Sequence, residues 1–423
     1  MSTGNGPPRR PARLLLIPLL LVLIWAVALA FDGVSAGERS PAASAVRGPA
    51  VSPSSTLAPP SSAPVAGRKE PRFRRLDGVT TAKAYPRFTE TFSAWRERVP
   101  RIRDVRIPSS VDGHRQPALW LPARREGRPL LVVLHSWSVS YKQRLGVPFA
   151  RWAERHGWSM MAPNFRGPND KATATGSDLA VQDVVDAIGW ARDRAAIDER
   201  RVFVIGFSGG GMMSLLMAGR HPGLLAGAVA WVPVHDLVEW YGYTSRRRPQ
   251  TRYPGHLRAS CGGDPSKSAG ARERCASRSP RAHLSSARTA AVPVYIGHGL
   301  GDRDVRPDHA VRAFNQLAAA ADRIPRAAVT EIRRNTLPPA LHRSIEGPTH
   351  FGSTDPRVLF ARKSGQATLV LFEGGHDMVF HPGLRWMWDL ARADRRGGAT
   401  VGAAGRPALA RDKAPVPGAA PIR

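Results

Sequence analysis

One serine in this sequence stands where a catalytic nucleophile is often found. The stretch from Val202 to Gly219 reads as a short apolar run, then the turn G-F-S-G-G, then residues with helical periodicity. A strand that turns sharply into a helix lifts the serine between them, Ser208, out of the sheet, and Gly206 and Gly210 leave room for that turn. Backbone N–H groups at the start of the helix would stabilise negative charge beside it. The stretch predicts an activated serine nucleophile.

The chain also supplies the base and the acid that such a serine needs. A serine hydroxyl is a weak nucleophile at neutral pH, so it requires a histidine, and the histidine requires an orienting carboxylate. In an open α/β sheet these residues lie on loops after later strands, in the order Ser, Asp, His. Asp302 and Asp304 follow the apolar run 293–299, and His376 follows the run 367–375. We predict His376 as the base and Asp302 as the acid. Asp304 is the alternative acid, and His350 and His381 are rival bases.

The reaction of a serine with a carbonyl group requires two further hydrogen-bond donors. Negative charge develops on the carbonyl oxygen in the transition state and has to be stabilised. The N–H of Gly209, directly after the nucleophile, is one expected donor. The loop after the run 130–135 should supply the other, through the N–H of Trp137 or of its rival Ser136. Arg166 could hold loops by hydrogen bonds or meet the substrate, and a structural role is favoured.

The apolar pattern predicts the sheet that would position these residues. Apolar runs of strand length alternate with amphipathic segments of helix length, which is typical of a mainly parallel sheet with helices on both faces. The turn signal Asp112-Gly113 within residues 105–122 predicts an antiparallel hairpin before that sheet. The expected strands are 130–135, 158–163, 202–207, 226–233, 293–299 and 367–375, and the expected helices are 147–157, 177–195, 308–321 and 382–395, with a further helix around Trp95.

The N-terminus predicts export. Arg9, Arg10 and Arg13 precede an apolar run over residues 14–31, and small residues follow at 34–36. Residues 1–36 therefore read as a signal peptide or a membrane anchor, and in either case the rest of the chain lies outside the cytoplasm. Two cysteines, Cys261 and Cys275, fit that destination because a close pair in an exported chain is expected to form a disulfide.

The composition limits the classes of partner and cofactor that we expect this protein to bind. The 423 residues include 62 Lys and Arg against 33 Asp and Glu, which gives a formal net charge of +29. The arginines are scattered through every segment, the longest run being residues 246–248, and no nucleic-acid-binding signature accompanies them, so we expect no nucleic acid partner. We also expect no metal and no organic cofactor, because the chain has no HExxH sequence, Cys/His cluster or dinucleotide fingerprint.

Several motifs together resemble a known family. The segment HGLGDRDV, from His298 to Val305, resembles the HGxxDxxV segment of the prolyl oligopeptidase family's catalytic domain, in which the first aspartate is the triad acid and here falls on Asp302. The turn GFSGGG and the segment EGGH around His376 are similar to the same α/β-hydrolase family. The segments RIPSSVDG, PLLVVLHSWS, APNFRGPND and GSDLAVQDVVDAIGWA extend the resemblance over residues 105–395. It implies an α/β-hydrolase fold and a serine peptidase or related hydrolase.

Two departures limit what the resemblance implies. Full-size members carry a large β-propeller before the hydrolase domain, whereas only residues 71–128 stand between the linker and the first parallel strand here. Relatives usually read HGG after that early strand, whereas this chain has His135 followed by Ser136 and Trp137. The first departure weakens a peptidase assignment relative to a hydrolase assignment. The second leaves the geometry of the oxyanion loop open.

These observations predict the domain organisation and the function. Residues 37–70 read as a Pro/Ala/Ser-rich linker, residues 71–395 as an α/β-hydrolase domain, and residues 396–423 as a disordered tail. Insertions near 241–289 and 323–365 would either shape a pocket or form plain surface loops. We expect an exported serine hydrolase that cleaves a small ester or peptide substrate. The alternative is a non-catalytic basic binding domain at the cell surface.

Overall fold

The structure is a computed structural model that describes residues 81, 89–342 and 344–397. The expected signal peptide or anchor, the linker and nearly all of the expected tail lie outside the described residues, and the predictions made for them stay predictions. Among the described residues, no helix combines the length and the apolar character that a membrane span requires. The last helix runs to Gly397 and so includes the first residues of the expected tail.

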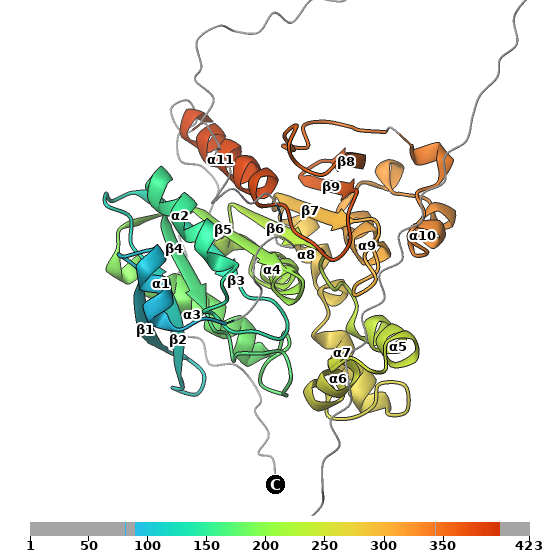
Figure 1. The fold of residues 1–423 in the computed structure, drawn as a ribbon, viewed down its shortest axis with the longest axis horizontal. Coiled ribbons are helices and arrows are strands. Elements are labelled where there is room, and N and C mark those ends of the chain that lie inside the picture. The colour runs from blue at the N-terminus through green and yellow to red at the C-terminus, as the bar shows by residue number, and fades with distance from the viewer. Residues whose placement is uncertain (1–80, 82–88, 343, 398–423) are drawn as a thin grey trace, which may run out of the picture. The chain divides into compact units, whose positions relative to one another are not determined.

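A single sheet organises the described residues, and Figure 1 shows helices on both of its faces. Its strands are β1 Arg103–Pro108, β2 Arg115–Leu121, β3 Arg128–Leu134, β4 Ser159–Pro163, β5 Ile197–Phe207, β6 Gly227–Trp231, β7 Val294–Gly299, β8 Val358–Ser364 and β9 Ala367–Phe372. They lie in the order β1-β2-β4-β3-β5-β6-β7-β9-β8. The pairs from β4 to β9 are parallel, and the outer pairs are antiparallel. This is the α/β-hydrolase fold with the N-terminal hairpin that the sequence predicts.

The structure has helices where the sequence predicts them and also in the two insertions, where no helix was predicted. They are α1 Phe92–Arg98, α2 Gly146–His156, α3 Asp178–Arg194, α4 Gly209–Arg220, α5 Leu237–Arg247, α6 Tyr253–Cys261, α7 Ala269–Ser277, α8 Leu284–Thr289, α9 Asp308–Leu317, α10 Arg326–Ile332 and α11 Phe380–Gly397. Local capping sets several of the ends. The Ser177 side chain accepts a hydrogen bond from the N–H of Ala180 and begins α3, while Gly157 adopts a left-handed conformation and ends α2.

Alternate residues of the central strands build two separate cores. Leu130 and Val132 of β3 belong to a core that also contains residues of α3, α4 and α9, whereas Leu131 and Val133 of the same strand belong to a core with residues of α1, α2 and α11. Side chains alternate between the two faces of a strand, so a strand that is apolar at every position is buried on both sides. This double burial fixes the strands, and with them the loops that leave their ends.

The two insertions differ from plain loops. The first, residues 241–289, contains most of α5 and all of α6 to α8, and a disulfide between Cys261 and Cys275 joins α6 to α7. The second, residues 323–365, contains α10 and the strand β8, which pairs antiparallel with β9. The sequence analysis missed β8 because this edge strand is only partly buried and carries Arg362 and Lys363, which interrupt its apolar pattern.

Candidate active site

The turn between β5 and α4 holds Ser208 in a strained backbone conformation. Its φ of 58° and ψ of −113° lie in a region that a residue with a side chain rarely adopts. A Cβ atom at Gly206 would lie 2.2 Å from the carbonyl of Gly210, and one at Gly210 would lie 2.2 Å from the carbonyl oxygen of Leu134. The turn can therefore form only with glycine on both sides of the serine.

The structure brings Ser208, His376 and Asp302 into one chain of hydrogen bonds. The Nε2 atom of His376 lies 3.0 Å from the Ser208 Oγ, and its Nδ1 atom lies 2.7 Å from an Asp302 carboxylate oxygen. Ser208 follows β5, Asp302 follows β7 and His376 follows β9, so all three lie at the carboxyl ends of parallel strands. This is the geometry of a Ser-His-Asp triad.

Asp302 is fully buried, and its carboxylate is surrounded by donors. Its Oδ1 accepts hydrogen bonds from the N–H groups of Asp304 at 2.8 Å and Val305 at 3.0 Å, while its Oδ2 faces His376. Burial by itself raises the pKa of Asp302, but the charge of His376 and hydrogen bonds from His298 and His376 outweigh it, so the pKa lies well below its usual range. The carboxylate therefore stays ionised beside the imidazole.

A second histidine, His298, contacts the same carboxylate from inside the protein. Its Nε2 atom lies 3.2 Å from the Asp302 Oδ2 and 3.0 Å from the carbonyl oxygen of Val305, and the side chain is fully buried. His298 is the first residue of HGLGDRDV, and no role is predicted for it from the sequence. The signal that could have identified it is a histidine inside a buried strand, four residues before the acid.

The rival residues make other contacts. Asp304 forms an ion pair with Arg248 at 2.9 Å, so the structure places Asp302, and not Asp304, against His376. His350 lies 3.4 Å from Asp389, and His381 lies 4.0 Å from Asp355. Neither contact includes Ser208.

The loop after β3 lies against the start of α4. A Cβ atom at Gly209 would lie 2.8 Å from the backbone nitrogen of Trp137, so the two N–H groups are neighbours. The N–H and the hydroxyl of Ser136 both donate to the Gln143 side chain, at 3.0 and 2.8 Å. The N–H of Trp137 has no acceptor among the described residues. Of the two candidates in this loop, Trp137 therefore has the available donor beside Gly209.

The helices α5 and α6 contribute aromatic residues that form a wall next to this loop. The Trp137 ring lies 4.7 Å from the Trp240 ring and 6.5 Å from the Tyr253 ring, centroid to centroid, and its Nε1–H donates to His256 at 3.2 Å. Trp240, at the start of α5, also donates to the carbonyl oxygen of Asp304 at 2.9 Å. The helices α5 and α6 therefore contact both the oxyanion loop and the loop that carries the acid.

The second insertion supports the acid loop from another side. The Asn335 side-chain amide donates to the carbonyl oxygens of Leu300 at 2.7 Å and Asp302 at 2.8 Å. Asn335 itself has a φ of 63°, a left-handed conformation that asparagine tolerates better than most residues. Between them, the two insertions hold the loop of residues 300–305 in place.

Arg166 has the structural role that the sequence favoured. Its guanidinium donates to the Asp183 carboxylate of α3 at 2.7 and 3.0 Å and to Asp112 in the hairpin turn at 2.6 and 3.0 Å. It also donates to the Ser109 hydroxyl at 3.0 Å. Arg166 therefore joins the hairpin to the helix α3.

Three side chains of the site also have the residue types of a metal site. One oxygen each of Asp302 and Asp304 and one nitrogen of His376 lie within 4.8 Å of one another. The Asp302 carboxylate, however, already accepts four hydrogen-bonding or ionic contacts from the protein, and Asp304 is paired with Arg248. These contacts occupy the oxygens that a cation would need, and the expectation of no metal stays a prediction.

Comparisons with known proteins show what the chain is similar to. Residues 153–346 match the prolyl oligopeptidase family model. Acetylxylan esterase A of Emericella nidulans is 27% identical over 27% of this chain, and the chain spans only 41% of that relative's length. Among solved structures, a puromycin-hydrolysing peptidase of Mycobacterium tuberculosis matches 70% of this chain and 39% of its own, with 19% identity and a TM-score of 0.45. The acylaminoacyl peptidase of Pyrococcus horikoshii matches 51% and 34%, with 17% identity and a TM-score of 0.42.

The strand order and the family match together assign the fold. That match includes Ser208 and Asp302 and ends before His376. The family match bears out the resemblance noted in the sequence, and both it and the esterase relative support the enzyme class that the resemblance implies. The chain has an α/β-hydrolase fold that resembles the catalytic domain of the prolyl oligopeptidase family, and its relatives include both peptidases and esterases.

Proposed function

We propose that this protein hydrolyses a carboxylic ester or a peptide bond outside the cytoplasm, with Ser208, His376 and Asp302 as its catalytic triad. The observation that carries the proposal is the continuous set of contacts from the Ser208 Oγ through both nitrogens of His376 to the ionised carboxylate of Asp302. The proposal is supported by the backbone nitrogen of Trp137, which lies close to Gly209, the residue directly after the serine.

In the first half of the reaction, His376 Nε2 takes the proton of the Ser208 hydroxyl as its Oγ attacks the substrate carbonyl carbon. The carbonyl oxygen becomes negative and accepts hydrogen bonds from the N–H groups of Gly209 and Trp137. The Asp302 carboxylate accepts the Nδ1–H of His376 and stabilises the imidazolium. His376 then returns the proton to the departing oxygen or nitrogen, and an acyl-enzyme on Ser208 remains.

In the second half, water takes the place of the leaving group. His376 removes a proton from that water, the resulting hydroxide attacks the acyl carbon, and the same N–H pair stabilises the second oxyanion. Breakdown of this intermediate returns the proton to the Ser208 Oγ and releases a carboxylic acid. Bond making and bond breaking balance with water as the only co-reactant.

The aromatic wall favours a substrate with an apolar group next to its carbonyl. Trp137 belongs to the oxyanion loop and is buried against the buried Trp240, and Tyr253 is the partly exposed member of the wall that a substrate could contact. Apolar surface of this kind stabilises a bound acyl chain or an aromatic side chain by removing it from water. Ester and peptide substrates pass through the same tetrahedral chemistry, so the wall does not separate them.

Export is part of the proposal. It is supported by the positive residues and apolar run near the N-terminus and by the disulfide between Cys261 and Cys275, since disulfides persist in oxidising compartments. Whether residues 1–36 are cleaved or act as an anchor is a question for N-terminal sequencing of the secreted and membrane fractions.

One experiment tests the reaction and its substrate together. The full chain is assayed with p-nitrophenyl esters of increasing acyl length and with p-nitroanilides of proline and alanine, each next to Ser208→Ala. We expect turnover of at least one series, rising with acyl length if the aromatic wall binds the acyl group, and a loss of roughly 10⁴-fold or more in the variant. The same turnover in Ser208→Ala, or none in any series with folded protein, contradicts the proposal.

A further inference from the structure

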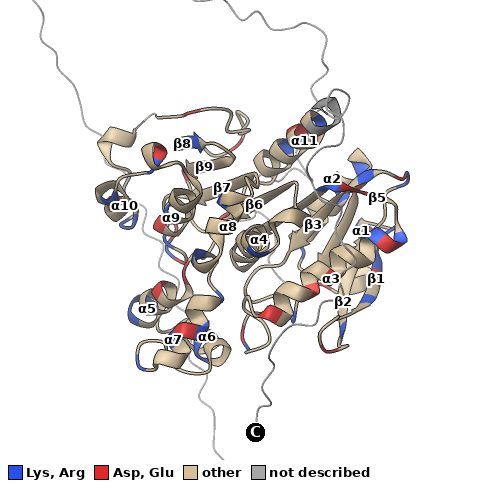
Figure 2. Ribbon diagram, turned by 180° about the vertical axis from the view of Figure 1, so that it is seen from behind, with Lys and Arg blue, Asp and Glu red and all other residues tan. Residues whose placement is uncertain are grey.

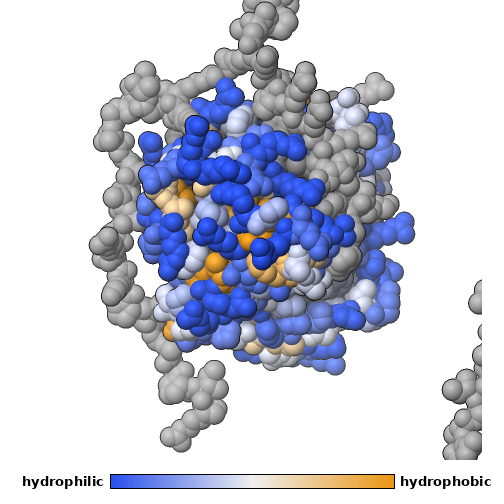
Figure 3. Space-filling model, turned by 60° about the vertical axis from the view of Figure 1, so that its left-hand side comes forward, coloured by the Kyte–Doolittle hydropathy of each residue, from blue (hydrophilic) through white to orange (hydrophobic). Residues whose placement is uncertain are grey.

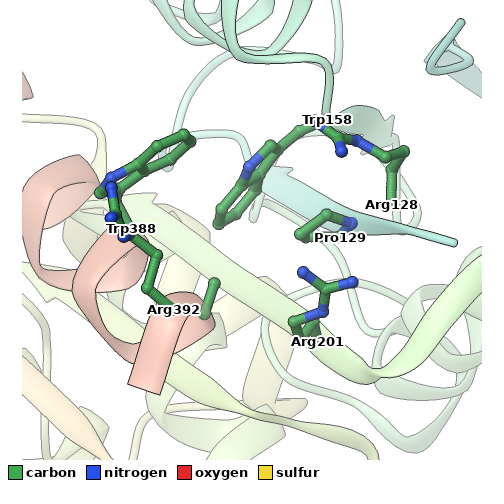
Figure 4. Close-up of a pocket in the computed structure, with 7 residues that line it drawn as sticks. Arg128, Pro129, Trp158, Arg201, Trp388 and Arg392 are labelled. Carbon is green, nitrogen blue, oxygen red and sulfur yellow. The ribbon is translucent and has the colours of Figure 1, made fainter. Parts of the chain in front are cut away.

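A hollow of about 310 Å³ lies at the edge of the sheet opposite the triad. Its lining comes from the start of β3, from the residue before β4, from the first half of β5 and from the last turns of α11 (Figure 4). These strands are parallel, and the triad follows the carboxyl ends of β5, β7 and β9. The hollow therefore cannot serve the substrate that Ser208 would attack.

The floor of the hollow is apolar and aromatic. Trp158 and Trp388 lie with their ring centroids 6.3 Å apart and their planes within 17°, and Pro129 and Ala391 complete the lining (Figure 4). Trp158 also stacks on Phe203 at 5.4 Å. The floor is thus fixed by core contacts, and its aromatic faces suit an apolar or planar group.

The other three lining residues are arginines, and no carboxylate is among the lining residues. Arg128 donates to the carbonyl oxygens of Gly157 at 2.8 Å and His156 at 3.2 Å, which holds its guanidinium at the end of α2. Arg392 is exposed, lies 6.0 Å from the Trp388 ring centroid and has no carboxylate partner among the described residues. Neither of these two positive charges is neutralised by a carboxylate of the described side chains.

Arg201, the third arginine, is buried and fixed. Its Nε donates to Asp198 at 2.6 Å and its Nη2 to the carbonyl oxygen of Gly127 at 2.8 Å, and the residue is 5% exposed. Its Nη1 has no acceptor among the described residues, and the same is true of the Nη1 of Arg128. Two held guanidinium groups with available donors form a site built for an anion.

The surface beside the hollow is also basic. A neighbouring depression shares Arg128, and its other arginines, Arg124, Arg125 and Arg155, are exposed without carboxylate partners among the described residues. Its one acid, Glu154, is paired with Arg101 at 3.4 Å. The exposed Glu126 lies close in sequence and offsets only part of this charge. Figure 2 marks the charged residues along α1, α2 and α11, and Figure 3 shows hydrophobic patches set among hydrophilic residues on the side that carries α2.

We propose that this hollow binds an anion in which a phosphate or carboxylate group is joined to an apolar or aromatic group. The guanidinium groups would bind the anionic group, and the two tryptophans would pack against the rest of the ligand. The volume is near the lower end of the range for small-ligand pockets, which fits one head group or one ring with a short substituent. The same chemistry is offered by a soluble aryl phosphate and by the head group and upper acyl chain of an anionic lipid. The proposal does not depend on the reaction at Ser208.

The test uses the full chain and one soluble and one lipid probe. Phenyl phosphate is titrated by calorimetry, and co-sedimentation is measured with phosphatidylcholine vesicles with and without phosphatidylglycerol. Arg392→Glu reverses an exposed charge at the rim, and Ala391→Leu fills part of the floor without a change of charge. The matched controls on α10 are Arg326→Glu and Ala328→Leu, because Arg326 is exposed as Arg392 is, and Ala328 is buried as Ala391 is. Melting temperatures of all four variants verify folding.

We expect Arg392→Glu to weaken binding of at least one probe by about tenfold, the size of a charge-assisted hydrogen bond to an anion. Ala391→Leu should weaken the same binding severalfold, and neither control should change it. A loss confined to phenyl phosphate identifies a soluble ligand, and a loss confined to phosphatidylglycerol vesicles identifies a lipid.

Three results overturn the proposal. The first is that neither probe binds. The second is equal binding in the Arg392→Glu and Arg326→Glu variants. The third is weaker binding in Arg392→Glu together with wild-type binding in a folded Ala391→Leu variant. The last result would mean that surface charge attracts anions without use of the hollow. If Ala391→Leu does not fold, the comparison of probe binding between Arg392→Glu and Arg326→Glu decides the question alone.

Discussion

Charged side chains have different surroundings at the two ends of the parallel strands, which we call the carboxyl edge and the amino edge of the sheet. At the carboxyl edge, Asp302 is buried and each of its oxygens has protein partners. At the amino edge, Arg128 and Arg392 face a hollow with no carboxylate in its lining. A carboxylate held by fixed donors is preorganised for chemistry on another molecule, whereas charges without partners are available to bind one. We therefore expect the carboxyl edge to carry out the hydrolysis and the amino edge to bind an anionic ligand.

The largest expected effect separates the two aspartates of the acid loop. Asp302→Asn should lower kcat by about 10⁴-fold because the imidazole loses its orienting charge. Asp304→Asn removes an ion pair with Arg248 at a partly exposed position, and we expect a loss of a few-fold at most. The kcat values of both variants on one ester substrate check this. Similar losses in the two would mean that the acid has been misassigned.

The next largest effect is a loss of stability when a side chain is introduced into the close-packed turn at Ser208. Gly210→Ala places a methyl group 2.2 Å from the carbonyl oxygen of Leu134, so we expect a destabilisation of roughly 3–5 kcal/mol. Gly189→Ala in α3 is the control, because a Cβ there meets nothing within 4 Å, and alanine should stabilise the helix by about 0.5–1 kcal/mol. Urea unfolding of both variants measures the contrast, and a tolerated Gly210→Ala would disprove the described turn.

His298 tests whether the second partner of Asp302 matters for turnover. His298→Leu removes a polar contact to the carboxylate, and we expect kcat to fall about 10- to 100-fold with little change in KM. His298→Gln can place an amide N–H near the position of Nε2 and should recover part of the loss. If both variants lower stability but keep the kcat of the wild type, His298 is a packing residue and does not position Asp302.

Buried histidines predict how stability depends on pH. Burial lowers the pKa of His235 to about 4, and burial also holds the pKa of His309 well below its usual range. The unfolded chain then binds more protons than the folded one below about pH 6.5, so stability falls as pH drops from 6.5 towards 4. His235 alone would contribute about 3 kcal/mol of this loss. Melting temperatures between pH 7 and pH 4 should show a weaker dependence in a folded His235→Gln variant, and equal slopes would contradict the assignment.

The smallest expected effect is that of a chelator. Because Asp302 is fully engaged by protein donors, prolonged treatment with EDTA should leave kcat unchanged, and addition of Zn²⁺ or Mn²⁺ should not increase it. A loss of activity that a specific cation restores would show that Asp302, Asp304 and His376 act as ligands instead.

Much of the catalytic edge could be predicted from the sequence because its parts carry local signals. The apolar runs marked the strands, the glycines marked the turn at Ser208, and chain order paired Asp302 with His376. The contact of His298 with Asp302 was not predictable in this way, because it depends on how a loop folds back on its own strand. The partnership of Ser136 with Gln143, which leaves Trp137 as the available donor, is equally a result of tertiary packing.

The hollow at the amino edge of the sheet could not be predicted from the sequence. Arg128, Trp158, Arg201 and Trp388 are far apart in the sequence, and in an arginine-rich chain none of them stands out from the composition. Only the parallel register of β3, β4 and β5, with α11 packed across them, brings the four together. Strand β8 was missed for a related reason, since its pairing with β9 and not its own apolar pattern defines it.

The central claim is that Ser208 is an activated nucleophile, and labelling with a fluorophosphonate probe tests it most directly. The probe reacts with a serine whose hydroxyl is deprotonated by a neighbouring base and whose oxyanion is stabilised. We predict stoichiometric labelling of the full chain at one peptide that contains Ser208, and none in a folded Ser208→Ala variant. Labelling that persists in that variant, or that maps to another residue, would contradict the account.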